Sequence, residues 1–399
     1  MEKNKKKILI IGGGFGGIKV ALELADNDRF DVALLSEQDN FRYYPTLYHA
    51  ATGGRLSASQ IPLSEIFAGK NVKLIKDSAK NIDRTAKHVV GESGKKYSYD
   101  DLVIALGVIT NYFGIKGLKE YSYGIKTIED ATELRDHLHK QMLDEGKPDL
   151  NYVVIGGGPT GVELAGALPA YLKSIMARHG IKKHSLHIDL VEAAPQLMGR
   201  MPKSYSKAVA RRLRRLGVKL YLGQTVSAET AEGLTVSGHD IASHTVVWTA
   251  GVTNHPFFSA NEFKLNERGK VLVDDHLQAE DNIYVIGDNA DTLYSGMAQT
   301  ALYDASFVTR NLKRLARGKA AKAYTPKRPI YVTPVGPWWA AVLWGKVQIY
   351  GKLGWLLRSA ADFRGFNDYE PWWKSSKHWL AENMEGPEDC TICAPKKIA

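Results

Sequence analysis

The hydrophobic pattern at the start of the chain predicts a βαβ unit. Residues 8–11 are four consecutive aliphatic side chains, the pattern of a strand that is buried on both faces of a parallel sheet. Apolar positions recur at helical spacing over residues 18–25, and residues 30–36 have the pattern of a second strand. Strand, helix and strand in this order are typical of a doubly wound α/β domain.

Three glycines lie between the first strand and the helix. Gly12, Gly14 and Gly17 have the spacing G-x-G-x-x-G, in which the first permits a tight turn, the second lets a pyrophosphate approach and the third lets the helix pack on the strand. The start of the helix adds free N–H groups for the phosphates. Ser36 occupies the usual position of an acid that binds an adenosine ribose, and Glu37 comes next, so Glu37 is the candidate ribose ligand.

The same pattern returns in the middle of the chain. Gly156, Gly158 and Gly161 follow a predicted strand and precede a predicted helix, and a later strand ends at Glu192. These features predict a second dinucleotide site. Two such sites indicate electron transfer between two dinucleotides, although a duplicated fold with one inactive site is the simpler alternative.

A further strand, residues 281–288, ends in Gly287 and Asp288, which alone is an ordinary strand-to-turn Gly-Asp. With the two glycine loops before it, the chain resembles the flavoproteins that have two dinucleotide-binding domains. More narrowly, it resembles the type II NADH:quinone oxidoreductases, also called alternative NADH dehydrogenases. Four segments carry this narrower resemblance: FRYYPTLYHAATGG (41–54), YDDLVIALGVITNYFGIKGL (99–118), TVVWTAGV (245–252) and GMAQTALYDA (296–305).

The resemblance implies an α/β fold with two Rossmann-like dinucleotide-binding domains, as in glutathione reductase, and a C-terminal membrane-binding segment. We expect a discontinuous FAD-binding domain (1–115 and 255–325), an NADH-binding domain (116–254) and a C-terminal segment and tail (326–399). The implied enzyme is a non-proton-pumping NADH:quinone oxidoreductase. It would transfer a hydride from NADH to FAD and then reduce a membrane quinone, either menaquinone or ubiquinone.

Carried over by position, the resemblance assigns residues to three roles, and it implies no metal. The expected FAD ligands are Gly12, Gly14, Phe15, Gly16, Gly17, Glu37, Pro45, Thr52, Ala105, Gly107, Asp288, Ala298 and Gln299. The expected NADH ligands are Gly156, Gly158, Gly161, Glu192, Ala250 and Gly251. The candidates for quinone chemistry are Glu163, Gln299 and Tyr303.

Three of these assignments leave alternatives open. Tyr303 stands where the family signature A-Q-x-A-x-Q has its second glutamine, although a phenol can still donate a hydrogen bond and stack on a quinone. Glu163 is a proton relay if burial raises its pKa, or otherwise an ordinary glutamate in the first turn of a helix. Glu192 favours NADH because a carboxylate repels the 2′-phosphate of NADPH, while Arg200 and Lys203 weaken that preference.

The last part of the chain is rich in tryptophan. Residues 334–359, PVGPWWAAVLWGKVQIYGKLGWLLRS, combine four tryptophans with aliphatic and cationic side chains. The longest uncharged stretch is shorter than the roughly 20 residues of a spanning helix and contains two prolines, so we expect a segment that lies on the membrane. The side chains expected in the acyl boundary are Trp339, Leu343, Leu353 and Leu357, and the cations expected at the head groups are Lys346, Lys352, Arg358 and Arg364. The alternative is a hairpin or short helices that pack on the FAD-binding domain.

Charge narrows the choice of partner. The net charge of +10 favours an anionic partner, for which an anionic membrane surface is the better candidate. Nucleic acid is disfavoured because the basic run 207–220 has the pattern of an amphipathic helix whose Val209, Leu213 and Leu216 face inward and whose cations are solvated.

Two other functions remain open. A soluble NAD(P)H-dependent reductase of a ferredoxin or rubredoxin would dock its acidic partner on a basic face, but it would not require the tryptophans. A non-enzymatic nucleotide sensor would not require two complete sites. Cys390 and Cys393, the only cysteines, lie in the tail and cannot form a redox pair beside a flavin held early in the chain. We expect a peripheral protein on the cytoplasmic face of the cell membrane, and the sequence leaves a homodimer open.

Overall fold

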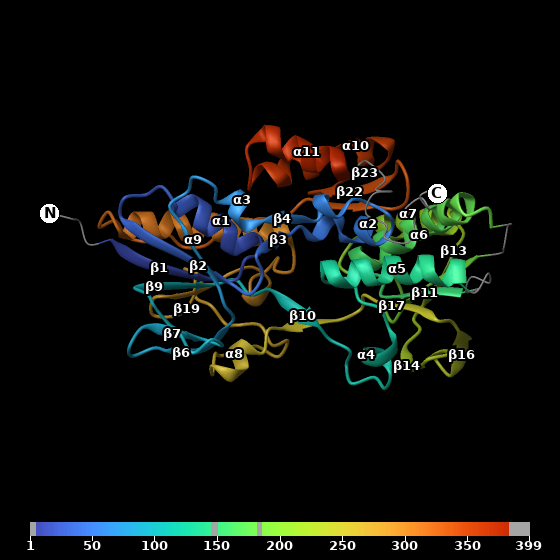
Figure 1. Ribbon diagram of the computed structural model, residues 1–399, viewed down its shortest axis with the longest axis horizontal. Helices are drawn as coiled ribbons and strands as arrows, with labels where there is room; N and C mark the ends of the chain where they lie inside the picture. Colours follow the sequence, from blue (N-terminus) through green and yellow to red (C-terminus); the bar gives the residue numbers. More distant parts are fainter. Residues whose placement is uncertain (1–4, 145–150, 182–185, 383–399) are drawn as a thin grey trace, which may run out of the picture.

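The structure is a computed structural model that describes residues 5–144, 151–181 and 186–382. It contains two sheet-based halves, and a C-terminal unit lies along one long side of both (Figure 1). The pair Cys390 and Cys393 falls outside the described residues.

The first half is built on a six-stranded sheet with the order β19-β20-β9-β1-β2-β5, parallel except for β19. Its strands are β1 (Lys6–Ile11), β2 (Phe30–Ser36), β5 (Lys73–Lys76), β9 (Asp101–Ile104), β19 (Gln278–Glu280) and β20 (Ile283–Val285). Ile8 and Ile10 face the core under the helices α1 (Phe15–Leu24) and α9 (Ala298–Leu315). Leu9 and Ile11 face the core under the meander β6 (Ala79–Asp83), β7 (His88–Gly91) and β8 (Lys96–Ser98). Burial on both faces explains the unbroken aliphatic run of β1.

The second half repeats this plan with a parallel sheet of order β13-β12-β11-β17. Its strands are β11 (Asn151–Ile155), β12 (His187–Glu192), β13 (Val218–Leu222) and β17 (Thr245–Trp248). One face packs on α5 (Ile128–Asp144), α6 (Pro159–Arg178) and α7 (Lys203–Arg215), and the other on β14 (Val226–Thr230), β15 (Gly233–Val236) and β16 (His239–Ala242). Val209 and Leu213 are fully buried, as the sequence predicted for the basic helix.

The halves are joined by two antiparallel strands, β10 (Val108–Thr110) and β18 (Val252–Asn254). The remaining short elements are β3 (Asn40–Arg42), η1 (Tyr44–Thr46), α2 (Leu47–Ala51), η2 (Leu56–Ala58), β4 (Gln60–Pro62), α3 (Leu63–Ile66), α4 (Leu118–Tyr121), α8 (Phe257–Ala260) and η3 (Gly287–Asn289). Leu47, Ala50 and Ala51 of α2 belong to the core of the second half, so the segment after β2 connects the halves.

The C-terminal unit bridges the two halves. It consists of β21 (Tyr331–Pro334), β22 (Ala340–Trp344), β23 (Val347–Gly351), α10 (Lys352–Asn367) and α11 (Trp372–Glu382). Ala341 and Leu343 belong to the core of the second half, while Phe366 and Tyr369 belong to the core of the first. The ring of Phe366 lies 4.3 Å from that of Tyr43.

Two expectations for this unit were wrong. Leu343 is 2% exposed because β22 is the central strand of a meander that packs on the second half. Arg358 is 7% exposed and paired with Asp362 and Glu382, so it does not reach lipid head groups. Leu353 is exposed as expected. The exposed large apolar side chains of the unit are Trp338, Trp344, Val347, Leu353, Leu356, Trp372, Trp373 and Leu380. Among the described residues, no helix has the length and apolar content needed to cross a bilayer.

Candidate functional site

The first glycine loop connects β1 to α1. Gly12 has φ of +109°, and a Cβ atom there would lie 2.3 Å from the carbonyl oxygen of Ala105. A Cβ at Gly17 would lie 2.0 Å from the carbonyl oxygen of Gly12, so only glycine lets the helix approach the strand. At Gly14 a Cβ would meet no atom of the described residues within 4 Å. The loop thus leaves open space in front of the N–H groups that begin α1, where a phosphate can bind.

The second loop, between β11 and α6, repeats this geometry. Gly156 has φ of +114°, and a Cβ there would lie 2.7 Å from Thr249 Oγ1. A Cβ at Gly161 would lie 1.9 Å from the carbonyl oxygen of Gly156. A Cβ at Gly158 would meet nothing within 4 Å in the described part of the chain. Both loops are therefore tight at their first and third glycines and open at the second.

The residues expected to surround the first loop come together at the carboxyl ends of the parallel strands. Ala105 and Gly107 follow β9, Asp288 lies in η3 after β20, and Ala298 begins α9. Phe15 and Gly16 form the first turn of α1, where Gly16 lies against Ile286. Glu37 follows β2, Pro45 lies in η1, and Thr52 caps α2 by donating to the carbonyl of Tyr48 at 2.9 Å.

Two buried side chains that the sequence analysis did not single out hold this edge in place. Asn289, fully buried, accepts from Gly107 N at 2.8 Å and donates to the Gly107 carbonyl at 2.5 Å and to Asn254 Oδ1 at 2.6 Å. Asp304 of α9 accepts from Gly287 N at 3.0 Å. Asn289 thereby fixes the turn around Asp288 to both joining strands, since Gly107 precedes β10 and Asn254 ends β18.

Lys126 is a third residue that the sequence did not single out, because it lies outside the four segments that carry the family resemblance. Its ammonium group lies 5.0 Å from the centre of the Tyr44 ring, which the Arg42 guanidinium also approaches at 5.7 Å. Burial lowers the pKa of Lys126, and the carboxylate of Asp288 opposes this shift. Two cations therefore lie over the Tyr44 ring, and one of them, Lys126, interacts with Asp288.

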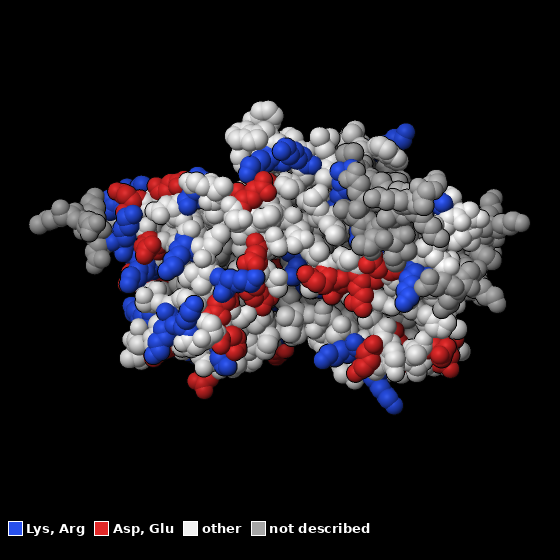
Figure 2. Space-filling view, viewed as in Figure 1, with Lys and Arg blue, Asp and Glu red and all other residues white. Residues whose placement is uncertain are grey.

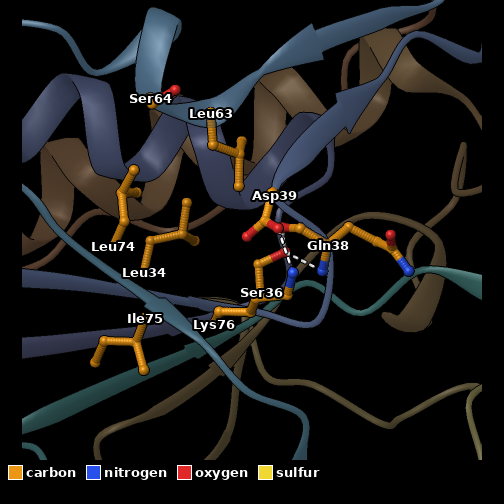
Figure 3. Close-up of a pocket in the computed structure, with 9 residues that line it drawn as sticks. All are labelled: Leu34, Ser36, Gln38, Asp39, Leu63, Ser64, Leu74, Ile75 and Lys76. Atoms are coloured by element: carbon orange, nitrogen blue, oxygen red, sulfur yellow. Dashed lines mark hydrogen bonds and ion pairs between the residues drawn. The ribbon is translucent and has the colours of Figure 1, made fainter.

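A pocket of about 270 Å³ lies beside the first loop (Figure 3). Its lining residues are Leu34, Ser36, Gln38, Asp39, Leu63, Ser64, Leu74, Ile75 and Lys76. Leucine side chains cover one part of it, while Ser36, Gln38 and the Asp39–Lys76 ion pair form a polar part (Figure 3). This combination suits a flat ring with polar edges.

The two candidate ribose acids occupy different positions relative to their loops. A Cβ at Gly157 would lie 2.9 Å from Glu192 Oε2, and one at the equivalent Gly13 would lie 2.5 Å from Ser36 Oγ. Glu192 accepts hydrogen bonds from Gly157 N at 2.5 Å and Ala194 N at 2.7 Å. Ser36 is thus the counterpart of Glu192, and Glu37 lies exposed one residue further, accepting from Ser78 Oγ at 3.3 Å.

The other residues expected at the second loop lie after β17. Ala250 packs against Gly156, since a Cβ added at Gly156 would lie 2.8 Å from the Cα of Ala250. A Cβ at Gly251 would lie 2.3 Å from the carbonyl oxygen of Asn111 and 2.6 Å from the Phe113 ring. Gly251 therefore permits the second half to approach the joining strand β10.

Glu163 is the fifth residue of α6, just past its first turn, and lies two residues after the last glycine of the loop. It keeps some accessible surface, but many protein atoms surround its carboxyl group, and this burial raises its pKa to about 8. The Arg358 guanidinium opposes the shift and Glu382 adds to it. Arg358 is itself fixed by donating to the carbonyl of Pro45 at 3.1 Å. The C-terminal unit thus supplies charges that act on Glu163.

Gln299 and Tyr303 both lie on α9, near the segment that leads into β21. Gln299 Oε1 accepts from Ile330 N at 2.7 Å. The ammonium group of Lys327 lies 5.5 Å from the centre of the Tyr303 ring, and burial raises the pKa of this tyrosine. Both side chains are therefore engaged with the same segment, so the tyrosine in place of glutamine still lies on the surface that faces the C-terminal unit.

Comparison with known proteins agrees with this geometry. The sequence model of the pyridine nucleotide-disulphide oxidoreductase family matches residues 6–305. The chain is 30% identical over 388 residues to the type II NADH:quinone oxidoreductase Ndh of Mycobacterium tuberculosis, covering 88% of this chain and 82% of that protein. It is 28% identical over 345 residues to the type II NADH:quinone oxidoreductase of Staphylococcus haemolyticus, covering 80% and 85%.

Solved structures share the fold. The NDH2 structure from Plasmodium falciparum in complex with NADH superposes with a TM-score of 0.85 at 16% identity, covering 98% of this chain and all of that one. The sulfide:quinone oxidoreductase of Aquifex aeolicus superposes with a TM-score of 0.78 at 22% identity, covering 94% and 92%. From the sequence matches, the chain belongs to the pyridine nucleotide-disulphide oxidoreductase family and, within it, to the type II NADH:quinone oxidoreductases.

Proposed function

We propose that the two glycine loops divide the cofactors of this NADH:quinone oxidoreductase, with FAD at residues 12–17 and NADH at residues 156–161. The observation that carries two dinucleotide sites is the repeated loop geometry, which within each loop is open only at Gly14 and at Gly158. FAD is assigned to the first loop because Asp288 follows β20 of the same sheet. The proposed FAD-binding domain is the first half (1–115 and 255–325), and the proposed NADH-binding domain is the second (116–254).

The residues proposed to hold FAD follow the carboxyl edge of the first sheet. The N–H groups at Gly14 would receive the pyrophosphate, Asp288 the ribityl hydroxyls, and the pocket lined by Ser36 and Gln38 the adenosine end. Lys126, which interacts with Asp288, would add positive charge there. When bound, FAD accepts a hydride from NADH and passes two electrons to a quinone. The protein has to hold the nicotinamide ring of NADH against the isoalloxazine ring of FAD. The hydrogen bonds from Asn289 to Gly107 and Asn254, which hold the joining strands, would serve this purpose.

The quinone side of the site lies where α9, α6 and the C-terminal unit meet. Reduction of a quinone consumes two protons. Glu163, whose pKa of about 8 leaves it protonated at neutral pH, would deliver one of them. Gln299 and Tyr303 would shape the pocket from α9, and the quinone would enter from the membrane.

The exposed apolar side chains of the C-terminal unit support peripheral binding to an anionic membrane. Leu353 and Leu356 lie on α10, and Trp372 and Trp373 begin α11. Figure 2 shows an uncharged crest over these helices with Lys and Arg side chains beside it. Tryptophan favours the membrane interface, and the cations favour acidic head groups. We place the enzyme on the cytoplasmic face of the cell membrane.

Replacing both Leu353 and Leu356 with serine should weaken binding to lipid vesicles. Each exposed leucine that enters the acyl boundary contributes about 1.5–3 kcal/mol, so the double variant should lose at least tenfold in partition. Flotation with vesicles measures this. The matched control is Leu315→Ser on the last turn of α9, an exposed leucine outside the C-terminal unit. Equal partition of all three proteins would show that α10 does not contact lipid.

Replacing Gln299 with alanine should lower quinone turnover severalfold and leave flavin reduction by NADH unchanged. The substitution removes the acceptor that holds Ile330 N, and so loosens the approach to β21. Gln299→Glu retains an acceptor oxygen and should recover part of the rate. Stopped-flow absorbance separates the half-reactions, and an equal loss in both would contradict a role on the quinone side.

One experiment tests the whole function. Flavin reduction by NADH and by NADPH is followed in the stopped flow, and reoxidation is then followed with menaquinone, ubiquinone and oxygen. Fast reduction by NADH with fast reoxidation by a quinone is the expected result. Reduction without quinone reoxidation would favour a soluble reductase of a carrier protein instead.

A further inference from the structure

The helix α7 carries a ridge of positive charge that the proposed redox chemistry does not use. Lys203, Lys207, Arg211 and Arg215 recur at every fourth position, and the helix KSYSKAVARRLRR contains no acidic residue. All four are exposed. Like charges four residues apart destabilise a helix, so this arrangement has a cost unless an anion neutralises it.

The ridge lies beside the C-terminal unit. Ser204 Oγ donates to Gln348 Oε1 of β23 at 2.8 Å, and Ser204, Arg211 and Arg215 share one stripe of the helix because they are seven and eleven residues apart. At the other end of the helix, Arg212 Nε donates to the Val335 carbonyl at 3.1 Å. The ridge therefore runs for about 18 Å alongside the sheet of the C-terminal unit.

Two exposed tryptophans mark the ends of the same sheet. Trp344 ends β22 next to Val347, and Trp338 lies in the turn before β22, 63% exposed. Trp338 has φ of +57°, a conformation that a bulky side chain rarely adopts. The turn is held by Arg212, whose Nη2 donates to the Pro337 carbonyl at 3.0 Å, and by Trp355, whose ring lies 4.4 Å from that of Trp338. A strained turn that displays an apolar ring to solvent, beside exposed cations, matches the surface of a lipid interface.

We propose that α7 binds the head groups of anionic lipids, so that the NADH-binding half docks on the same bilayer as the C-terminal unit. The inference rests on the proposed membrane binding and adds a second contact in a different half. Arg211 and Arg215 face the phosphates, Trp338 and Trp344 lie at the interface, and Arg212 holds the turn that carries Trp338. Lipid is the favoured anion over nucleic acid because the tryptophans flank the cations at both ends of the strand.

The test compares flotation of the holoenzyme with vesicles of phosphatidylcholine, with and without phosphatidylglycerol. Each arginine near an acidic surface contributes about a fivefold factor in partition, which is about 1 kcal/mol. Arg211→Gln with Arg215→Gln should therefore lose at least tenfold in binding to the acidic vesicles and little in binding to the neutral ones. The matched control, Lys95→Gln with Lys96→Gln, removes two exposed cations of the meander at β8. It should change neither the binding to acidic vesicles nor the binding to neutral ones. NADH oxidation with ferricyanide and the flavin spectrum should be unchanged in both variants.

The outcomes separate this inference from the proposed function. If the wild type binds both vesicles and the arginine variant keeps its preference for phosphatidylglycerol, α7 does not contact lipid, while membrane binding by the C-terminal unit stands. If the wild type binds neither vesicle, both proposals fail. Retention of the wild type on RNA without a preference for acidic vesicles would also overturn the lipid assignment. Protection of the α7 arginines from trypsin by acidic vesicles alone would support it.

Discussion

Replacing Gly14 with valine should give a folded protein that binds FAD at least a hundredfold more weakly, a loss of about 2.7 kcal/mol. The structure separates folding from binding at this position. A Cβ at Gly12 or Gly17 would overlap backbone atoms, whereas one at Gly14 points into open space among the described residues. A branched side chain in that space would occupy the place of the pyrophosphate and cover the N–H groups at the start of α1.

The measurement is the ratio of flavin to protein absorbance after purification, with circular dichroism as the check on folding. The matched control is Gly158→Val, which makes the same change in the second loop. It should retain full flavin and lose rapid reduction by NADH. Full flavin occupancy in the Gly14 variant, or flavin loss in the Gly158 variant, would contradict the assignment of the two loops.

The loops could be predicted because their geometry is local. The glycine spacing and the strand and helix around it lie within one short segment, and the third glycine of each loop is tight against the carbonyl of the first. The second loop repeats the first. The long-range contacts could not be predicted in this way. Asn289 clamps Gly107 across 182 positions, and Arg358 reaches Pro45 across 313. A single sequence carries no signal for such pairs.

The interpretation of the tryptophan-rich segment was partly wrong for a physical reason. An apolar residue on the central strand of a meander and one on a membrane surface look alike in sequence, because both are flanked by turns and cations. Leu343 proved to be core, while Leu353, on the first turn of α10, is exposed. The position of each side chain depends on how the unit packs between the two halves, which the local pattern does not contain.

Arg358 shows what this packing implies for chemistry. Its charge is buried among Asp362, Glu382 and the Pro45 carbonyl, and it acts on the carboxyl group of Glu163 in the second half. The C-terminal unit is thus both the proposed membrane contact and part of the electrostatic environment of the proposed proton relay. Removing the segment from residue 366 onward would therefore disturb more than membrane binding, since Phe366 and Tyr369 are core residues.

Replacing Glu163 with glutamine should slow quinone reduction by about 10²–10³-fold, within the range of a lost general acid, and leave flavin reduction by NADH intact. In the wild type the carboxyl group is protonated below its pKa of about 8. Reoxidation of the flavin by quinone should therefore be constant at neutral pH and fall about tenfold per pH unit above that value. The glutamine variant should show no such pH dependence. Stopped-flow reoxidation across this pH range is the measurement, and Glu163→Asp, which keeps an ionisable acid, should recover part of the rate.

Stability gives an independent readout for the same residue. The folded pKa of Glu163, about 8, lies above its ordinary value of 4.5, so the folded state holds a proton that the unfolded state has lost between these two values. Within that window, this residue lowers the free energy of unfolding of the wild type by about 1.4 kcal/mol per pH unit as pH rises, and the glutamine variant avoids this loss. Denaturant unfolding of both proteins should show a gap that widens from about pH 5 to about pH 8 in favour of the variant. A constant gap, together with an unchanged pH profile of reoxidation, would show that Glu163 ionises as an ordinary surface glutamate and carries no proton to the quinone.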